Sequence, residues 1–557
     1  MITLDTIRPV PLFAALDEVQ RARVADHAAE LLLNPGEYAV YEGEMPAFFF
    51  ILAGTLEMTK QVGLVEQVVR ACNVGDYFGE MPILMGTASP AGVRATTPSQ
   101  VLRLEAQDFR QLVAGRPAFA QAILAELARS MTGLQEFALK VPTSRVTLSG
   151  PRWNPVAYRL RDFLARNNVL FTWQVVEERR GSPAEEPPIS ARLNDGTVLT
   201  NPTIRDLATR LGIQTAPARQ AYDLAIVGAG PAGLSAAVYG ASEGLATLLL
   251  EREAPGGQVG TSSRIENYLG FPAGISGNEL GRRAFEQAMR LGAKVVITRE
   301  VLALHAGEIY HELVLDGGDV VRARAVLLAT GVDWRRLAVP DIDRFLGCGV
   351  YYGAARTEAL AARGQAVYLV GGGNSAGQAA MFFANYAQQV TLLVRKPDLS
   401  SSMSQYLIDQ LATKSNIQIE ANSEVLAVEG AQHLEAIAVL NHATQQTTRR
   451  ATNALFVFIG ADVNLPWLPA AVACNGQGYV LTGAEVRTRA EAPRWPLARD
   501  PFYLETSLPG LFAAGDVRAG SVKRVASGVG EGSVVVSSIH AYLATAPVAP
   551  PPGEAAS

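Results

Sequence analysis

A strand–glycine turn–helix pattern, which occurs twice after residue 220, constrains the fold more than any other feature of the sequence. The first copy, "DLAIVGAGPAGLSAAVYG", has the spacing GxGxxG in Gly228, Gly230 and Gly233. Gly228 allows a tight turn, Gly230 lets the backbone approach a pyrophosphate, and Gly233 lets the helix pack close to the strand. Glu251 ends the next apolar strand, where an acid can bind ribose hydroxyls. This combination predicts a doubly wound α/β domain with a dinucleotide at a helix N-terminus.

The second copy, "AVYLVGGGNSAGQAAMFF", repeats the turn but changes the end of the next strand. Arg395 and Lys396 stand there in place of an acid. A cation at this position suits the 2′-phosphate of NADP(H), although a solvated strand end gives the same pattern. We therefore expect an NADPH site here, formed by Gly371, Gly373, Asn374, Ser375, Ala376, Arg395 and Lys396.

The composition narrows the class of protein. The 557 residues exceed what one hydrophobic core supports, so several domains are expected. The formal net charge of −5 provides no basic face for nucleic acid, and no apolar run approaches the about 20 residues that span a bilayer. The first residues also lack the pattern of a secretory signal, which leads us to expect a cytoplasmic protein.

Cysteine and histidine usage excludes several kinds of site. The three cysteines are Cys72, Cys348 and Cys474, and no two of them stand at CxxC spacing. This count excludes a disulfide framework and a cysteine-rich metal site. The six histidines form no HxxxH or HExxH pattern, so we expect no metal site.

Residues 221–545 resemble the low-molecular-weight thioredoxin reductases, a family of two-domain flavoenzymes. The motifs that carry the resemblance are "VGAGPAG", "PGGQVGTSSRIENYLGFP", "LLATG", "VGGGNSA", "FVFIG" and "GLFAAGDV". The resemblance implies an FAD-binding domain in two parts, 221–342 and 463–545, with an NADPH-binding domain over 343–462 inserted between them. It also implies a homodimer. The implied FAD contacts are Gly228, Gly230, Pro231, Ala232, Gly233, Glu251, Gln258, Asn267, Thr330, Gly331, Gly515, Asp516, Arg524, Val525 and Ala526.

The stretch "GVYYGAAR" departs from that family. It falls where the family carries its redox-active CxxC pair, and Gly353 and Arg356 stand in the two cysteine positions. The resemblance therefore implies hydride transfer from NADPH to FAD without a catalytic dithiol. The electrons would pass to an unidentified acceptor such as oxygen, a quinone or a one-electron carrier protein. One alternative is a regulatory or sensor flavoprotein with little turnover, and another is a thiol reductase that uses Cys348.

The first block, residues 1–140, resembles a cyclic-nucleotide-binding domain, which is a β-barrel with helices. The motifs are "PGEYAVYEGE", "FFFILAGTLEM" and "GDYFGEMPIL", and Glu80 is the ribose-binding acid. Ser89 stands where that family has an arginine for the cyclic phosphate, and Arg94 follows five residues later. Because an unpaired buried phosphate is costly, we expect no binding of cAMP or cGMP. Weak or altered nucleotide binding is the alternative.

The second block, residues 141–220, resembles glutaredoxin, a small α/β domain of the thioredoxin fold. Asn154 and Ala157 occupy the positions of its two cysteines, Pro155 is retained, and Pro187 or Pro188 would be the cis-proline. A generic α/β linker domain is the alternative. The expected fold class is therefore multidomain: a β-barrel with helices, a small thioredoxin-fold-like domain, and two doubly wound dinucleotide-binding domains. Residues 546–557 are Pro/Ala-rich, which predicts a disordered tail.

Overall fold

Two compact units make up the chain in the computed structural model. The first comprises residues 1–145 and 168–170, and the second comprises 146–167 and 171–557. The structure describes residues 4–8, 10–62, 65–115, 119–121, 123, 145–176, 187–262, 265–272, 274–353, 362–488 and 495–547. Arg356, most of residues 116–144 and most of the expected C-terminal tail lie outside the described residues.

The first unit contains two four-stranded sheets and several short helices. The strand β3 (Ala47–Ala53) is buried on both faces because its side chains alternate between two cores. Phe48 and Phe50 pack in the cluster that includes Phe109, whereas Phe49 and Ile51 pack in the cluster between the sheets. One sheet has the order β1-β8-β3-β6 and the other β2-β7-β4-β5. The other elements are α1 (Leu4–Ile7), η1 (Pro11–Ala15), α2 (Glu18–His27), β1 (Ala29–Leu33), β2 (Tyr38–Val40), β4 (Leu56–Val62), β5 (Val65–Cys72), β6 (Tyr77–Phe78), α3 (Glu80–Met85), β7 (Gly92–Ala95), β8 (Ser99–Glu105) and α4 (Ala106–Gly115).

The second unit begins with a small four-stranded sheet in the order β10-β9-β11-β12, which we call the small domain. β9 and β10 are parallel, and β11 is antiparallel to both β9 and β12. The helix α6 buries Leu160, Phe163 and Leu164 on one face. The peptide bond before Pro188 is not cis, so the expectation of a cis-proline is not met there, and the bond before Pro187 involves Glu186, which lies outside the described residues. The elements are β9 (Val146–Gly150), α6 (Pro155–Arg166), β10 (Phe171–Val175), β11 (Ser190–Leu193), β12 (Val198–Thr200) and α7 (Ile204–Arg210).

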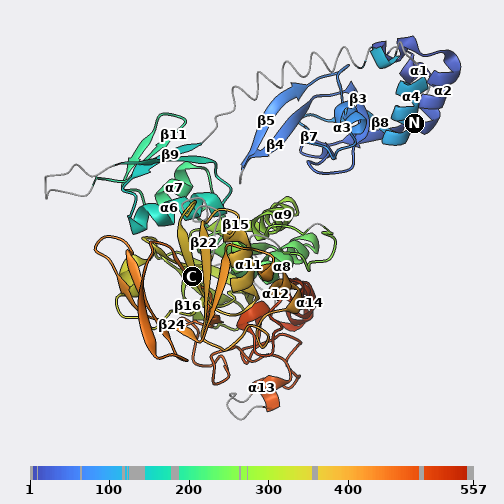
Figure 1. Ribbon diagram of the computed structural model, residues 1–557. Helices are drawn as coiled ribbons and strands as arrows, with labels where there is room; N and C mark the ends of the chain where they lie inside the picture. The colour runs from blue at the N-terminus through green and yellow to red at the C-terminus, as the bar shows by residue number, and fades with distance from the viewer. Residues whose placement is uncertain are drawn as a thin grey trace. The chain divides into compact units, whose positions relative to one another are not determined.

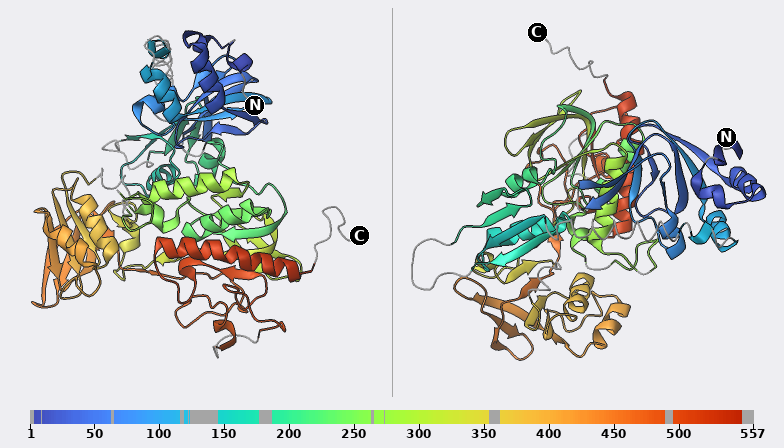
Figure 2. Two further views of the ribbon diagram at one scale, coloured as in Figure 1. Left: turned by 90° about the vertical axis from the view of Figure 1, so that its right-hand side faces the viewer. Right: turned by 90° about the horizontal axis from the view of Figure 1, so that it is seen from above.

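A seven-stranded sheet follows, with the order β15-β14-β13-β18-β17-β16 and β29 beside β18. The long helix α14 lies along α8, as the left view of Figure 2 shows. This approach needs Gly532, because a Cβ atom there would lie 2.1 Å from the carbonyl oxygen of Ala232. The elements are β13 (Ala221–Val227), α8 (Pro231–Ser242), β14 (Thr247–Glu251), η2 (Gly257–Thr261), α9 (Gly277–Arg290), β15 (Lys294–Ile297), β16 (Val301–His305), β17 (His311–Leu315), β18 (Val320–Leu328), α13 (Glu485–Thr488), β29 (Leu511–Ala513), η4 (Gly515–Val517) and α14 (Val525–Thr545).

Between β18 and β29 the chain forms a second parallel sheet, in the order β20-β27-β21-β22-β23. An antiparallel sheet, β24-β25-β26, and the two-stranded ribbon β19-β28 accompany it (Figure 1). The apolar strands of the five-stranded sheet form a core with α11 and α12. The elements are β19 (Asp333–Trp334), η3 (Ile342–Phe345), β20 (Val350–Tyr352), β21 (Ala366–Val370), α11 (Asn374–Phe383), β22 (Gln389–Val394), α12 (Gln405–Ala412), β23 (Ile417–Ala421), β24 (Ser423–Glu429), β25 (Ala436–Asn441), β26 (Gln446–Ala451), β27 (Leu455–Val457) and β28 (Ala461–Asp462).

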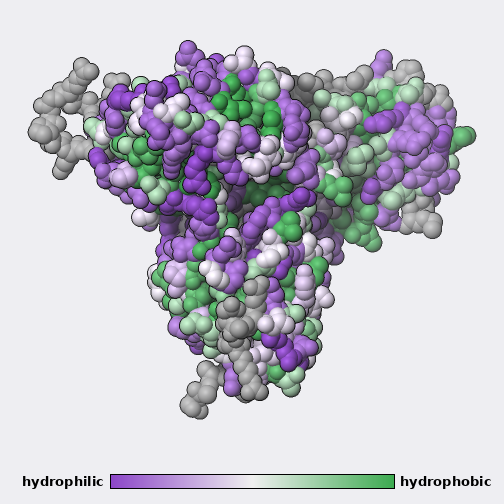
Figure 3. All heavy atoms as spheres, turned by 60° about the horizontal axis from the view of Figure 1, so that its bottom comes forward, coloured by the Kyte–Doolittle hydropathy of each residue, from purple (hydrophilic) through white to green (hydrophobic). Residues whose placement is uncertain are grey.

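The surface carries both polar and apolar side chains. On the face shown in Figure 3, hydrophilic and hydrophobic residues are interspersed over short distances. Among the described residues, no helix is both long and apolar enough to cross a membrane.

Candidate functional site

A pocket opens at the carboxyl ends of the parallel strands of the seven-stranded sheet, where β13 turns into α8. Gly228 has a φ of +104°, and a Cβ atom there would lie 2.4 Å from the carbonyl oxygen of Ala329. A Cβ atom at Gly233 would lie 1.9 Å from the carbonyl oxygen of Gly228. Gly230 lines the pocket as the N-cap of α8, and a Cβ atom there would meet nothing within 4 Å. The turn therefore presents its backbone and a helix N-terminus to the pocket, an arrangement that favours phosphate.

Glu251 closes one end of the pocket. Its carboxylate accepts hydrogen bonds from the backbone N–H groups of Ala229 at 2.7 Å and Glu253 at 2.8 Å. These bonds fix the acid directly beside the glycine turn. Burial raises the pKa of Glu251 above its usual value, and the two N–H donors oppose that rise.

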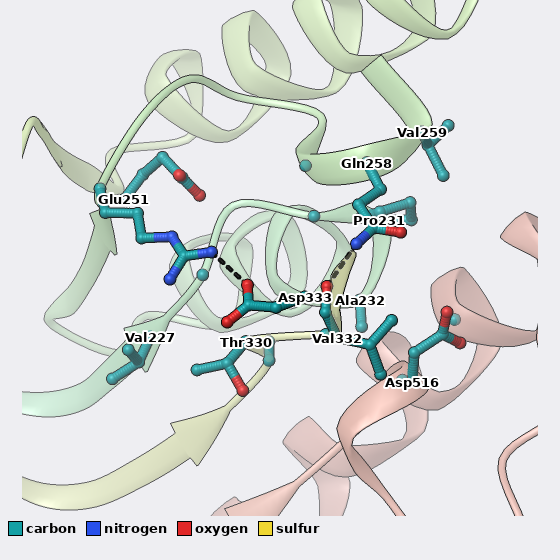
Figure 4. Close-up of a pocket in the computed structure, with 18 of the residues that line it drawn as sticks. Val227, Pro231, Ala232, Glu251, Gln258, Val259, Thr330, Val332, Asp333 and Asp516 are labelled. Carbon is teal, nitrogen blue, oxygen red and sulfur yellow. Dashed lines mark hydrogen bonds and ion pairs between the residues drawn. The ribbon is translucent and has the colours of Figure 1, made fainter. Parts of the chain in front are cut away.

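The remaining walls come from three further segments. Gln258 of η2 donates a hydrogen bond to the carbonyl oxygen of Val332. Asp516 of η4 lies at the opposite end of the pocket from Glu251, with Thr330 between them (Figure 4). The pKa of Asp516 is raised above its usual value, because burial outweighs the opposing effect of the nearby Lys523. The hydroxyl of Thr330 is buried and has no hydrogen-bond partner among the described residues, as expected of a group that awaits a ligand.

Most of the residues expected to contact FAD meet in this one pocket. Gly233, Asn267 and Ala526 are not among its lining residues: Gly233 packs beneath the turn, and the other two are exposed. The expected residues that line the pocket are Gly228, Gly230, Pro231, Ala232, Glu251, Gln258, Thr330, Gly331, Gly515, Asp516, Arg524 and Val525. The donor set suits a dinucleotide, because a glycine turn, a helix N-terminus and an acid lie together.

The second glycine turn lies between β21 and α11. Gly371 has a φ of +144°, and Gly373 is the N-cap of α11. Asn374 at the helix start exchanges hydrogen bonds with Ser404, at 2.9 Å from its Nδ2 and 2.8 Å to its Oδ1. Ala376 is buried in the helix and Ser375 is exposed.

The two cations of this second site are open to solvent. Arg395 and Lys396 follow β22 directly, and both are exposed. Lys396 Nζ donates to Ser401 Oγ at 3.2 Å, in the loop whose Ser402 bonds the carbonyl oxygen of Gly372 at 2.9 Å. The cationic strand end therefore lies beside the loop that borders the glycine turn.

Gly353 lies close to the pocket. A Cβ atom there would be 3.6 Å from the ring of Trp334 and 3.7 Å from the hydroxyl of Thr261, and both of those residues line the pocket. The φ of Gly353 is +88°, a backbone conformation that strains any residue with a Cβ atom. Cys348 is only 2% exposed, and the described residues hold no group of side chains that would bind a metal ion.

Two residues of the first unit that were weighed for binding a cyclic phosphate, Ser89 and Arg94, make contacts within the fold. Ser89 is buried, and its N–H donates to the carbonyl oxygen of Glu44 at 2.9 Å. Arg94 of β7 is bound by two carboxylates, Glu57 of the neighbouring strand β4 and Glu66 of β5, the next strand beyond β4, the second at 2.9 Å. The guanidinium of Arg94 is therefore neutralised by the protein.

Three residues that line the pocket lie far from the glycine motifs and were not predicted from the sequence. Arg166, at the end of α6, lines the pocket although it belongs to the small domain. Trp334 and Trp467 also line it. No motif marks these positions, because they reach the pocket through packing between segments distant in sequence. The one available signal for Trp334 was its place three residues after "LLATG" and before "GVYYGAAR".

Comparisons with known proteins agree with two of the three expected resemblances, those of residues 221–545 and of the first block. Residues 222–494 match the pyridine nucleotide-disulphide oxidoreductase family, and residues 30–116 match the cyclic nucleotide-binding domain. The chain is 31% identical over 322 residues to the 34.2 kDa protein in rubredoxin operon of Clostridium pasteurianum, a match covering 58% of this chain and 97% of that protein. It is 30% identical over 324 residues to the thioredoxin reductase of Treponema pallidum, covering 58% of this chain and 98% of that protein. The thioredoxin reductase of Lactococcus lactis, in its FR conformation, has a TM-score of 0.52 at 26% identity, covering 58% of this chain and 99% of that chain.

Proposed function

Because this chain belongs to the thioredoxin reductase-like pyridine nucleotide-disulphide oxidoreductases, we propose that it transfers a hydride from NADPH to FAD and passes the electrons to an acceptor that is not a disulfide. Thioredoxin reductases use FAD and NADPH. The observation that carries the proposal is the pocket around the first glycine turn, together with the absence of any CxxC in the sequence. The acceptor would be oxygen, a quinone or a one-electron carrier protein.

The proposed domain boundaries follow the expectation from the sequence. They are 1–140 for the cyclic-nucleotide-binding-like domain, 141–220 for the small domain, 221–342 and 463–545 for the FAD-binding domain, and 343–462 for the NADPH-binding domain. The return of the chain to the first sheet through β29 supports the insertion. A homodimer is part of the proposal, since thioredoxin reductases are typically homodimers.

When bound, FAD supplies the hydride acceptor and the store for its electron pair. The residues of this chain would bind and orient it. The N-terminus of α8 and the backbone of Gly230 would hold the pyrophosphate, and Glu251 would accept hydrogen bonds from the ribose. Asp516 would hold the ribityl hydroxyls at the other end, and the N-terminus of α14, beginning at Val525, would stabilise negative charge on the reduced ring.

The cysteines support a non-disulfide acceptor. A dithiol relay needs an attacking thiolate and a second thiol that resolves the mixed disulfide. Cys72 and Cys348 are buried, and burial raises the pKa of both Cys72 and Cys474, which disfavours the thiolate. We therefore rank the alternative function, a thiol reductase that uses Cys348, below the proposed function.

The small domain is, in this proposal, a glutaredoxin-like module without thiols. Its strand order, with α6 between two parallel strands, supports that assignment. At the position of the first cysteine, the Asn154 side chain caps α6 by accepting the N–H groups of Val156 at 2.9 Å and Ala157 at 3.0 Å. The neighbouring Trp153 stacks on His433 at 4.5 Å between ring centroids. This edge therefore packs against the proposed NADPH-binding domain, where a glutaredoxin would need access for a substrate.

NADPH should be preferred over NADH. The change Arg395→Glu is expected to weaken NADPH binding by about 10- to 100-fold, because it removes a charge-assisted contact to the 2′-phosphate and adds repulsion. NADH, which lacks that phosphate, should be affected little. The measurement is the dependence of the flavin reduction rate on each nucleotide in a stopped-flow instrument.

The control for this change is Arg363→Glu, because Arg363 is also exposed but precedes β21 and lies at the other end of that strand from the glycine turn. The control should leave both nucleotides unaffected. Equal rates with NADPH and NADH in the unaltered protein would refute the assignment of Arg395 and Lys396.

Cyclic AMP and cyclic GMP should not bind the first unit at concentrations up to about 0.1 mM, because a buried phosphate without a cation is costly. Ser89 offers no charge, and Arg94 is already held by Glu57 and Glu66. Isothermal titration calorimetry on the full-length protein provides the measurement. A micromolar dissociation constant would show that Arg94 exchanges its carboxylate partners for the ligand.

The proposed function is tested by mixing the purified protein with NADPH without oxygen. Bleaching of the yellow flavin absorbance, followed by turnover with quinones, oxygen or a one-electron carrier, is the expected result. A sensor flavoprotein, which is the second candidate, would bleach very slowly or not at all. A colourless protein that FAD does not reconstitute would overturn both.

A further inference from the structure

The end of helix α6 reaches from the small domain into the pocket. Arg166 Nη1 donates to Glu253 Oε2 at 2.6 Å, and Nη2 donates to the carbonyl oxygen of Gly257 at 3.3 Å. The next residue, Asn167, is fully buried and donates through Nδ2 to the carbonyl oxygen of Glu253 at 3.3 Å. The contacts fix this helix end against the loop that follows Glu251.

Arg166 remains available to a ligand in this position. A guanidinium carries five N–H donors; the hydrogen bonds that the described residues make with it occupy two, and Asp162 Oδ2 lies 3.7 Å from the same Nη1 that donates to Glu253. Its side chain is 15% exposed, and the residue lines the pocket together with Glu251 and Gly257. The unoccupied donors therefore belong to a side chain at the wall of the pocket.

The surroundings of Arg166 favour its protonated, positively charged form. Burial opposes it, but Glu253 and Asp162 outweigh that effect and raise the pKa of Arg166 above its usual value. Burial likewise would raise the pKa of Glu253, yet the ion pair with Arg166 holds it below the usual value. Both shifts favour the ionised form of the pair.

Like Arg166, several other cations that line the pocket pair within the protein, and Arg524 is the exposed N-cap residue of α14. Arg252 pairs with Asp333, and Arg299 pairs with Asp316 at 3.0 Å and Asp319 at 2.6 Å. Lys523 donates to the backbone carbonyl of Asp516, at the far end of the pocket from Glu251. A dianionic pyrophosphate at the glycine turn would be stabilised by a full positive charge in addition to the partial positive charge at the N-terminus of α8.

We propose that Arg166 is an FAD-binding residue supplied by the small domain, and that it contacts the adenosine diphosphate half of the cofactor. The inference rests on the proposed function, since it requires FAD in this pocket. It gives the thiol-free small domain a role in forming the cofactor site. The rival explanation is that Arg166 only fastens the small domain through Glu253.

The test compares FAD affinity in variants of the full-length protein from which FAD has been removed. FAD titrations, followed by quenching of flavin fluorescence, would use the unaltered protein, Arg166→Lys, Arg166→Gln and the control Arg159→Ala. Arg159 lies on the same helix, but its side chain is exposed. We expect the dissociation constant to rise about 10- to 100-fold in Arg166→Gln, to rise less in Arg166→Lys, and to stay unchanged in Arg159→Ala.

A second readout separates cofactor binding from fastening. FAD raises the unfolding temperature by an amount that depends on its affinity, so this rise should shrink in Arg166→Gln. If Arg166 only fastens the domain, the unfolding temperatures with and without FAD fall together, the rise stays constant and the dissociation constant is unchanged, which would overturn the proposal. If Arg166→Gln does not fold, the comparison of Arg166→Lys with the unaltered protein decides by the same two readouts. Failure of the unaltered protein to bind FAD would instead refute the proposed function.

Discussion

Replacing Gly230 by valine is expected to give a folded protein that purifies without colour. A Cβ atom at Gly230 meets nothing within 4 Å, and its φ of −73° suits any residue, so the fold should tolerate the change. The same side chain would occupy the space through which a pyrophosphate approaches the backbone of the turn. Loss of two or more charge-assisted hydrogen bonds, at about 1.5–3 kcal/mol each, predicts FAD binding weaker by about 100-fold or more.

The measurement is the FAD content of the purified variant and its dissociation constant on reconstitution. Gly476→Val is the control, because Gly476 is exposed and a Cβ atom there also meets nothing within 4 Å. Circular dichroism should show both variants folded. Normal FAD content in a folded Gly230→Val protein would mean that this turn does not hold the cofactor.

Thioredoxin is expected to remain oxidised when it is mixed with this protein and NADPH. Neither Gly353 nor any other residue of "GVYYGAAR" carries a thiol. The left-handed backbone at Gly353 would also strain a cysteine at that position. The small domain likewise lacks the two thiols, because Asn154 and Ala157 stand in their positions. Turnover with thioredoxin or with the aromatic disulfide DTNB should therefore stay at the background without enzyme.

The variant Cys348→Ser makes this second prediction decisive. Since Cys348 is buried, its replacement should leave flavin reduction by NADPH unchanged. Thioredoxin turnover in the unaltered protein that disappears in Cys348→Ser would establish a thiol reductase and overturn the proposed acceptor class.

The glycine turn was predictable because its requirements are local. Gly228 and Gly233 are fixed by contacts within a few residues of the turn and with the adjacent strand end, so the motif alone indicates the backbone geometry. The acid at Glu251 was predictable for the same reason, since the end of β14 lies beside the end of β13 in a parallel sheet. The match of residues 30–116 to cyclic nucleotide-binding domains confirms that the first block resembles this family.

Contacts between distant segments were not predictable from one sequence. Nothing in the sequence indicates that Arg94 would be held by Glu57 and Glu66, because cross-strand pairing depends on register. Arg166 reaches the pocket only through the packing of α6 beside the loop after β14. At Pro188 the expectation of a cis-proline was wrong, because it was carried over from glutaredoxin and not from local chemistry.

The most direct test of the account is an anaerobic titration of the yellow protein with NADPH. A flavin without a dithiol stores one electron pair, whereas a flavin with a redox-active disulfide stores two. The account predicts that about one NADPH per FAD bleaches the flavin completely and that no further NADPH is oxidised. Consumption of about two NADPH per FAD before the end point would contradict it, because a second two-electron centre would then be present.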